Sequence, residues 1–432
     1  NIVPVLIGSA EQGHGITRLM KVLRHEGPHV ETTADRLGIP SDPELAATVV
    51  KTIHAAHTGK LSVCRVWRGT INEAQTIGDD RASGVYSLQG GENNKVGKAE
   101  AGDLVALGRM DSIQTGDLLT SKGREEGAEM MWPEVKQPVY ALAVTPLQRQ
   151  DEVKLTSSIA RLVEEDQSLS MEHIADTHQM LMWGQGEIHL KIAVERLKSK
   201  YNVDVETSLP RTAYKETIRK GTTQHSRFKR QSGGHGQFGD VQVEIRPLAR
   251  GVGFEFIDKV VGGSVPRQYI GAVEHGTREY CEKGPLGFPV VDVSVTLFDG
   301  QHHAVDSSDQ AFKIAGRLAM SEGMPNCYPV LLEPIYEVTI SVPNEYTNKI
   351  HSLVSGRRGQ ILGFEMRPGW KGWDDLKCTL PQQELQDLII ELRSLTVGVG
   401  SFTQKFDHLQ ELTGRLADQV VQARKEELED SR

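Results

Sequence analysis

The segment Ser232–Gly239 places the strongest constraint on how this chain can fold. It reads Ser-Gly-Gly-His-Gly-Gln-Phe-Gly, with four glycines in eight residues. Glycine in the interior of a helix or strand costs backbone entropy, so this segment must form a loop. The residues after it alternate between apolar and polar, which indicates a half-buried strand. That alternation runs Val241, Gln242, Val243, Glu244, Ile245, Arg246.

Residues 211–231, just before the glycine segment, are strongly basic. The cations there are Arg211, Lys215, Arg219, Lys220, Arg227, Lys229 and Arg230, and the one acidic residue among them is Glu216. A glycine loop lets main chain approach a phosphate closely, and neighbouring cations attract it. The pattern therefore suits RNA binding, and it is equally compatible with an ordinary β-hairpin that has a basic rim.

Length and composition set the class of protein. A chain of 432 residues is too long for one core and predicts about three domains. The net charge of -9 argues against a general nucleic-acid coat but permits a local basic face. The cysteines, Cys64, Cys281, Cys327 and Cys378, are far apart and form no C-x-x-C, so we expect a reducing compartment rather than a zinc ribbon or disulfide scaffold. We expect neither a membrane span nor a signal peptide.

Hydrophobic patterns divide the chain into modules. We predict the closing strand (Ile2–Ile7) and helix (Ile16, Leu19, Met20, Leu23) of an α/β domain over 1–27, and interpret the chain as a fragment. The further predictions are a linker at 28–43, a β-barrel at 44–130, a ferredoxin-like β-α-β-β-α-β order at 136–208, an α+β domain at 209–333, a second ferredoxin-like order at 334–406 and a terminal helix at 407–432.

Several elements within these modules are predicted in detail. In the α+β domain we expect strands at Gly253–Val260 and Phe288–Phe298 and helices at Tyr269–Glu282 and Ser308–Glu322, the second capped by Ser307 with Gln310. The tail carries Leu409, Leu412, Leu416 and Val420 at helical spacing. That helix could pack on its own chain or bind a partner.

Seven short motifs occur in one order along the chain. They are Gly8-Ser9-Ala10, Gly184–Leu190, Ser232–Gly239, Gly262–Pro266, Gly284–Asp292, His303–Ser308 and Ser355–Ile361. In this order the chain resembles elongation factor G, the translocation factor of bacterial ribosomes, over essentially its whole length. The resemblance implies a multidomain α+β fold: a translation-factor barrel, two ferredoxin-like α/β sandwiches, and an elongated domain of the ribosomal-protein-S5-like type.

The resemblance also implies a function. The family's fourth domain enters the decoding site in place of a tRNA anticodon stem, during GTP-dependent translocation of tRNA and mRNA. A cytoplasmic monomer that binds the ribosome, with its RNA and proteins, is therefore expected. A ribosomal protection or recycling factor on the same scaffold is the alternative within the family. A non-ribosomal RNA- or protein-binding scaffold is the alternative from another class.

The nucleotide motifs of the family are missing from this sequence. The chain has neither a G-x-x-x-x-G-K-[ST] loop nor an N-K-x-D motif, and no D-x-x-G motif follows such a loop. Without them the phosphates and magnesium cannot be held, so we expect no GTPase activity from this chain and assign GTP and Mg²⁺ to a longer parent protein. Ser9 and Ala10 match guanine-contacting positions and are interpreted as a remnant of that site.

The resemblance places the RNA-contacting tip in two loops, 232–237 and 301–306. The residues expected to meet RNA are Ser232, Gly233, Gly234, His235, Gly236, Gln237, Gln301, His302 and His303, and the candidates for RNA-backbone contact are Arg227, Lys229, Arg230, Arg357 and Arg358. His235 stands where the family usually has Arg, and Ala304 where it usually has Asp. Both differences lower the fixed charge of the loops, and they leave open a divergent paralogue.

Other chemistry is conceivable at the same residues. His302-His303, and His54 with His57 on an expected helix, could be metal ligands, but no third ligand is near in sequence and we expect no metal. Asp306, Ser307 and Asp309 fit helix capping better than paired carboxylates for acid–base catalysis. Arg357-Arg358 could equally be a solvated charged turn. We therefore expect no catalytic residue in this chain.

Overall fold

A computed structural model describes residues 4–41, 44–55, 58–125, 131–231 and 236–430. Contacts within the chain group it into two compact units. The first unit comprises residues 1–138, 145–171 and 188–206, and the second comprises 139–144, 172–187 and 207–432. The chain is a multidomain α+β protein with several separate sheets, as the sequence predicted.

The N-terminal segment differs from its prediction. Residues 4–7 form no strand, and Val5 and Ile7 are 84% and 92% exposed. The helix that follows is α1 (Ile16–His25), whose apolar face is also exposed. The predicted linker contains a second helix, α2 (Val30–Arg36), because Ala34 packs against Trp67 and Leu118 of the barrel. Prolines flank this helix rather than excluding it.

The barrel of the first unit is built around one seven-stranded sheet of order β11-β10-β1-β2-β9-β6-β7. Side chains of β2 (Gly59–Arg68) point to both faces of the sheet and enter two apolar clusters. Cys64 and Val66 belong to one cluster, and Leu61 and Val63 belong to the other. The remaining strands are β1 (Ala46–Ala55), β3 (Thr70–Asn72), β4 (Thr76–Ile77), β5 (Asp80–Arg81), β6 (Val85–Gln89), β7 (Glu92–Val96), β8 (Lys98–Glu100), β9 (Leu104–Gly108), β10 (Leu118–Thr120) and β11 (Gly123–Arg124).

The prediction that His54 lies on a helix is wrong. His54 lies in strand β1, where its Nε2 is 2.6 Å from Glu164 Oε2. Its backbone N–H donates to Glu165 at 2.6 Å. His57 lies outside the described residues.

Both ferredoxin-like predictions are met by the observed strand orders. The sheets read β13-β14-β12-β15 and β24-β21-β23-β22, so in each case the first and third strands of the module are central. The first module contains β12 (Tyr140–Pro146), η1 (Arg149–Asp151), α3 (Glu152–Glu165), β13 (Ser170–Ile174), β14 (Gln179–Gly184), α4 (Glu187–Tyr201) and β15 (Val205–Ser208). The second contains β21 (Pro329–Pro343), η3 (Asn344–Tyr346), α7 (Thr347–Gly356), β22 (Gln360–Met366), β23 (Trp373–Pro381), η4 (Gln382–Leu385), α8 (Leu388–Leu395) and β24 (Ser401–Leu412).

The prediction of helix over the whole tail is wrong in its first part. Leu409 and Leu412 belong to β24, which pairs with β21 from Leu331 to Ser341. The helix, α9, begins only at Arg415 and ends at Asp430. The leucine spacing fitted a helix by coincidence, and strand pairing with the long central strand decided the outcome.

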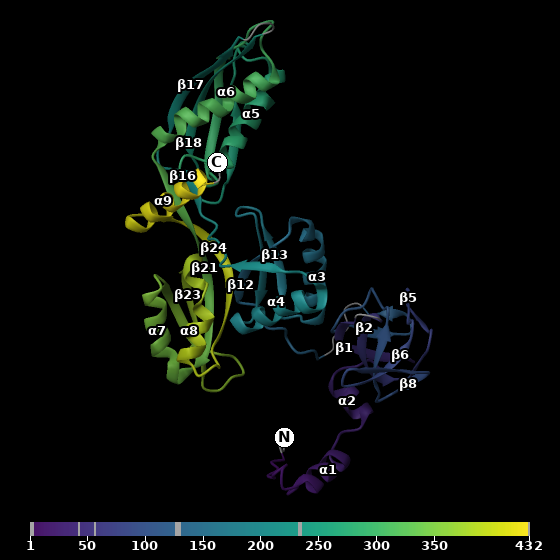
Figure 1. Cartoon of the computed structure of the whole chain (residues 1–432). Coiled ribbons are helices and arrows are strands. Elements are labelled where there is room, and N and C mark those ends of the chain that lie inside the picture. Colours follow the sequence, from purple (N-terminus) through teal and green to yellow (C-terminus); the bar gives the residue numbers. More distant parts are fainter. Residues whose placement is uncertain (1–3, 42–43, 56–57, 126–130, 232–235, 431–432) are drawn as a thin grey trace. The chain divides into compact units, whose positions relative to one another are not determined.

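The domain that carries the glycine segment has a four-stranded sheet of order β17-β18-β20-β19. Helices α5 (Arg267–Cys281) and α6 (Asp309–Gly323) lie together on one face of this sheet (Figure 1). The strands are β17 (Thr222–Arg230), β18 (Gln237–Pro247), β19 (Phe254–Asp258) and β20 (Val293–Gln301), and η2 (Met324–Cys327) follows α6. Strand β16 (Lys215–Ile218), which precedes them, pairs with β21 instead. The alternation predicted for β18 holds, since Val241, Val243 and Ile245 are buried.

The strand predicted at Phe288–Phe298 begins later than expected, at Val293. Its first residues belong instead to a loop held by the buried carboxylate of Glu216. Glu216 Oε2 accepts from the backbone N–H of Leu286 at 2.9 Å, and Oε1 accepts from that of Phe288 at 3.1 Å. Burial raises the pKa of Glu216 to about 7, while the backbone N–H donors act to lower it.

The close packing of α5 on α6 depends on Gly276, and the matched glycine Gly271 provides a control. A Cβ at Gly276 would overlap the carbonyl oxygen of Lys313, whereas one at Gly271 would meet nothing within 4 Å. We expect Gly276→Ala to lower the free energy of unfolding by about 2–3 kcal/mol. Gly271→Ala should raise it by about 0.5–1 kcal/mol through helix propensity. Urea denaturation measures both, and equal effects would contradict the packing described.

The Glu216 carboxyl predicts a pH dependence of stability. Between pH 4.5 and about 7 the folded chain keeps a proton that the unfolded chain has lost, so this group lowers the free energy of unfolding as pH rises, by about 3 kcal/mol in total. In Glu216→Gln that contribution is absent. The difference in stability between variant and wild type should therefore shift in favour of the variant as pH rises from 5 to 7. The control Glu282→Gln, at an exposed position, should show no such trend.

Candidate nucleic-acid interface

Strands β17 and β18 form a hairpin whose connection is the glycine segment. Their register pairs Arg230 with Gln237 and Arg227 with Asp240. The hairpin therefore brings the predicted backbone-binding cations beside the first residues after the loop. Residues 232–235, which include Ser232, Gly233, Gly234 and His235, lie outside the described residues.

The second predicted loop meets the first at the same end of the sheet. Strand β20 pairs with β18 so that Gln301 lies opposite Asp240. Asp306 then joins the two loops: its Oδ1 accepts from Gly236 N–H at 3.0 Å, and its backbone carbonyl accepts from Phe238 N–H at 2.8 Å. A Cβ at Gly236 would lie 2.9 Å from the Asp306 carboxyl carbon. A side chain at position 236 would therefore displace the Asp306 carboxylate.

His303 and Ser307 complete the join between the loops. Ser307 Oγ accepts from His303 N–H at 2.9 Å and donates to the Phe238 carbonyl at 3.0 Å. The residue that caps α6 is Ser308, whose hydroxyl accepts from Ala311 N–H at 3.2 Å. The prediction that Ser307 caps this helix is wrong by one residue, because the Ser307 hydroxyl is engaged between the loops.

A third loop lies at the same tip, and no sequence pattern pointed to its presence there. His302 Nδ1 is 3.3 Å from the carbonyl oxygen of Ser264, which brings residues 260–264 beside the second loop. Val261 in this third loop is 83% exposed, and Val305 in the second is 63% exposed. Exposed valines next to glycines present backbone and apolar surface together. The sequence marks Gly262-Gly263 as a motif but does not indicate that it lies beside the second loop.

The charges at the tip fall into two groups. Asp240 is buried and pairs with Arg227, at 2.5 Å, and with His225, at 3.0 Å, so the charge of Arg227 is largely compensated. Lys229 and Arg230 are exposed, and neither forms an ion pair with any residue in the described part of the chain. These two side chains are therefore the cations of the hairpin that remain available to an anionic partner.

Three other cations of the basic run have structural partners. Lys215 pairs with Asp176 at 2.7 Å, Arg219 pairs with Glu411, and the Lys220 ammonium lies 4.5 Å from the centre of the Tyr328 ring. These residues belong to the part of the run that leads into the domain rather than to its tip. The sequence could not separate the two groups, because spacing alone does not reveal ion pairs.

Arg357 and Arg358 are also engaged within the chain. Arg357 is 2.7 Å from Asp387 and 2.5 Å from Glu391, while Arg358 is 2.9 Å from Glu333 and 3.0 Å from Glu384. Despite partial burial, these carboxylates raise the pKa of both guanidinium groups. Contact of these arginines with RNA remains a prediction, and the geometry gives them a role in joining α7 to η4, α8 and β21.

Ser9 and Ala10 lie in a turn before α1. The backbone N–H of Ser9 donates to His14 O at 3.0 Å, and a Cβ at Gly8 would lie 2.6 Å from the same oxygen. The turn is therefore closed by backbone contacts that leave no room for a side chain at Gly8. The assignment of Ser9 and Ala10 as a remnant of a guanine site stays a prediction.

Two features are absent from the described residues, a cluster of metal ligands and a membrane-spanning helix. Over residues 4–41, 44–55, 58–125, 131–231 and 236–430, no group of three or more His, Cys, Asp or Glu side chains is placed to hold a metal ion. Within the same ranges no helix has the length and apolar character needed to cross a membrane.

Similarity to known proteins agrees with the order of these modules. Family models match residues 135–209 as elongation factor G domain III, residues 210–328 as elongation factor G domain IV, and residues 330–420 as the elongation factor G C-terminus. The chain belongs to the elongation factor G family. The tip described above lies within the segment matched as domain IV, which places the three loops at one end of that domain.

Two relatives of this elongation factor G-type chain extend the match. It is 50% identical over 418 residues to an "Elongation factor G-like protein" of Synechocystis sp., covering 96% of this chain and 62% of the relative. A crystal structure from Thermus thermophilus matches with a TM-score of 0.80 and 33% identity, covering 96% of this chain and 62% of that one. The chain therefore spans less than two thirds of the length of both relatives.

The contacts of Asp306 predict which substitution loosens the tip. In Asp306→Asn the backbone N–H of Gly236 can still reach an oxygen, but the charge that strengthens this bond and the contact to His303 is lost. We expect hydrogen exchange at Gly236 and Phe238 to quicken about tenfold, and the free energy of global unfolding to change by less than about 1 kcal/mol. Exchange at Val243, in the buried part of β18, serves as the internal reference.

Asp309→Asn is the matched control, because Asp309 lies three residues away in the first turn of α6. It should leave exchange at Gly236 unchanged. Equal acceleration in both variants would show that helix α6, rather than the join between the loops, fixes the tip.

Proposed function

We propose that this chain is the ribosome-binding part of an elongation factor G-like translational GTPase. In this proposal the tip of domain IV enters the decoding site and drives or secures the movement of tRNA and mRNA. GTP and Mg²⁺ are bound by a nucleotide domain in the longer protein, as the greater length of the relatives suggests. The parent protein is active as a cytoplasmic monomer.

One observation carries the proposal. Three loops converge at the end of a four-stranded sheet, joined by Asp306 and His302, and the hairpin beside them carries two exposed cations, Lys229 and Arg230. Glycine main chain, exposed imidazole and amide groups, and cations without carboxylate partners suit contact with ribose and phosphate. The described tip contains no arrangement of nucleophile and base, so its action is steric and electrostatic.

A ribosomal protection or recycling factor is the second candidate, because it would use the same domains. We rank it second because the sequences of the tip loops, Ser232–Gly239 and His303–Ser308, resemble the elongation type more closely. A translocation assay set beside a drug-rescue assay separates these two functions. Tip variants should fail in the first assay and behave as wild type in the second.

The exposed cations provide the test of ribosome contact. In the full-length protein, Lys229→Ala combined with Arg230→Ala should weaken sedimentation with ribosomes in the presence of a non-hydrolysable GTP analogue. The slope of log affinity against log salt should become shallower by roughly 1 to 2, as expected for two lost phosphate contacts. GTP affinity of the free protein should not change, because the nucleotide site is elsewhere.

Arg246→Ala combined with Arg317→Ala is the control of equal charge. Both arginines are exposed, in the same domain, and already beside a carboxylate. If this pair reduces binding as much as the tip pair, the effect comes from overall charge and the assignment of the tip fails. Unchanged sedimentation of the tip pair would have the same consequence.

A further inference from the structure

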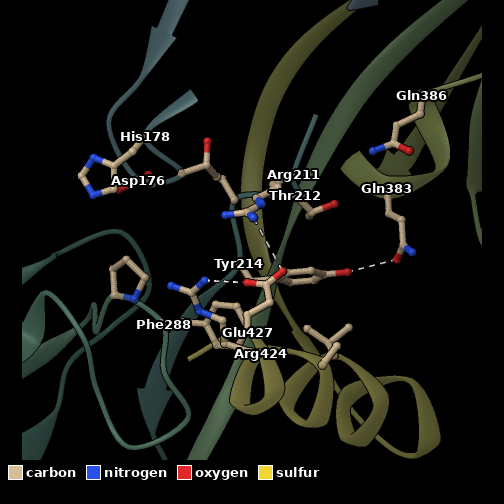
Figure 2. A pocket seen from close by; sticks show the side chains of 15 residues that line it. Asp176, His178, Arg211, Thr212, Tyr214, Phe288, Gln383, Gln386, Arg424 and Glu427 are labelled. Carbon is tan, nitrogen blue, oxygen red and sulfur yellow. Dashed lines mark hydrogen bonds and ion pairs between the residues drawn. The ribbon is translucent and has the colours of Figure 1, made fainter. Parts of the chain in front are cut away.

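A cavity of about 320 Å³ lies within the second unit, away from the tip (Figure 2). Its walls come from the turn between β13 and β14, residues 211–214, residues 288–289, the η4 region and helix α9. Cavities of this volume are at the lower end of those that bind small molecules. Neither the domain IV tip nor the family assignment accounts for it.

The segment 211–214 is held in place at the cavity by side-chain amides. Arg211 N–H donates to Gln179 Oε1 at 2.8 Å, and Ala213 N–H donates to Gln382 Oε1 at 3.1 Å. The Tyr214 hydroxyl donates to Gln383 Oε1 at 3.0 Å. This wall is therefore fixed before any ligand arrives, which reduces the entropy that binding would cost.

The charges around the cavity do not balance. Asp176 is compensated by Lys215 at 2.7 Å, and Glu427 by Arg424 at 2.8 Å. Arg211 is 3.9 Å from Glu427, beyond hydrogen-bond distance, and its side chain is 56% exposed. Figure 2 shows the Arg211 guanidinium directed toward Glu427 and Tyr214 across the cavity. One positive charge is thus left for an anion.

A buried hydroxyl and an apolar wall add to this charge. Thr177 is one of the residues that line the cavity, and its Oγ1, which is buried from solvent, has no hydrogen-bond partner among the described residues. An unpaired hydroxyl in such a place costs stability unless a ligand or water satisfies it. Phe288, Val420 and Ala423 form the apolar part, with Tyr214 packed edge-on against Phe288 at 5.7 Å.

We propose that this cavity binds a small organic anion, a phosphate or carboxylate with an apolar or aromatic body. Its anionic group bonds to the Arg211 guanidinium, and its body lies against Phe288 and α9. Because α9 and residues 211–214 both line the cavity, a ligand that contacts both stabilises the docking of α9 on the rest of this unit. No covalent step takes place.

The test uses phenyl phosphate and benzoate as probes of the two anion classes. The matched molecules are inorganic phosphate, which lacks the aromatic ring, and benzyl alcohol, which lacks the anionic group. Titrations followed by saturation-transfer NMR on the 432-residue chain give the dissociation constants. We expect phenyl phosphate or benzoate to bind with a dissociation constant of about 1 mM, and both matched molecules at least tenfold more weakly.

Two variants locate the binding. Arg211→Gln should raise the dissociation constant of the bound probe at least tenfold, and Ala423→Phe, which fills the cavity while keeping Arg211, should abolish binding. Arg317→Gln, a change at another exposed arginine, should leave it unaltered. Absence of saturable binding by both organic anions overturns the proposal, as does equal binding by inorganic phosphate or by Arg211→Gln. Ribosome sedimentation is a separate measurement, so failure here leaves the function proposed for the tip intact.

Discussion

The bonds from Asp306 to the start of β18 are the contacts on which the candidate interface depends. Through its side chain to Gly236 and its main chain to Phe238, this one residue joins loops that are seventy residues apart in sequence. Antiparallel pairing of β18 with both β17 and β20 brings the loops to one end of the sheet, and Asp306 then fixes their spacing. Without the bonds of Asp306, the hydrogen bonding between the two loops would rest mainly on the contact of Ser307 with Phe238.

Strand and helix periodicity predicted most elements of the second unit. Alternation at Val241, Val243 and Ile245 succeeded because one face of β18 is covered by helices and the other is not. The leucines at 409 and 412 misled, because their spacing fits a helix while pairing with β21 makes them a strand. The apolar residues 5–7 predicted a strand, but the structure has none there, since nothing in the described chain covers these residues.

The site was predicted less completely than the fold. Glycine content located the first loop and the resemblance located the second, but the third loop near Ser264 is brought in only by tertiary structure. Charge was the weakest guide: Arg227, Arg357 and Arg358 were equivalent to Lys229 and Arg230 in sequence, and the structure separates them by their carboxylate partners. A cation's partner can lie tens of residues away, so a local pattern cannot reveal which charges stay available.

The central claim is that the tip acts by lying beside paired RNA strands, and tethered cleavage tests it most directly. The four cysteines of this chain are buried, so, once any cysteine in the rest of the longer protein is replaced by serine, a single surface cysteine can carry an iron chelate that generates hydroxyl radicals. Val305→Cys places it at the tip, and Val252→Cys places it beyond the other end of β18, at a position 57% exposed. With the full-length protein on the ribosome, the account predicts cleavage of decoding-site RNA from position 305 and none there from position 252. Cleavage of that RNA from position 252, or its absence from position 305, would contradict it.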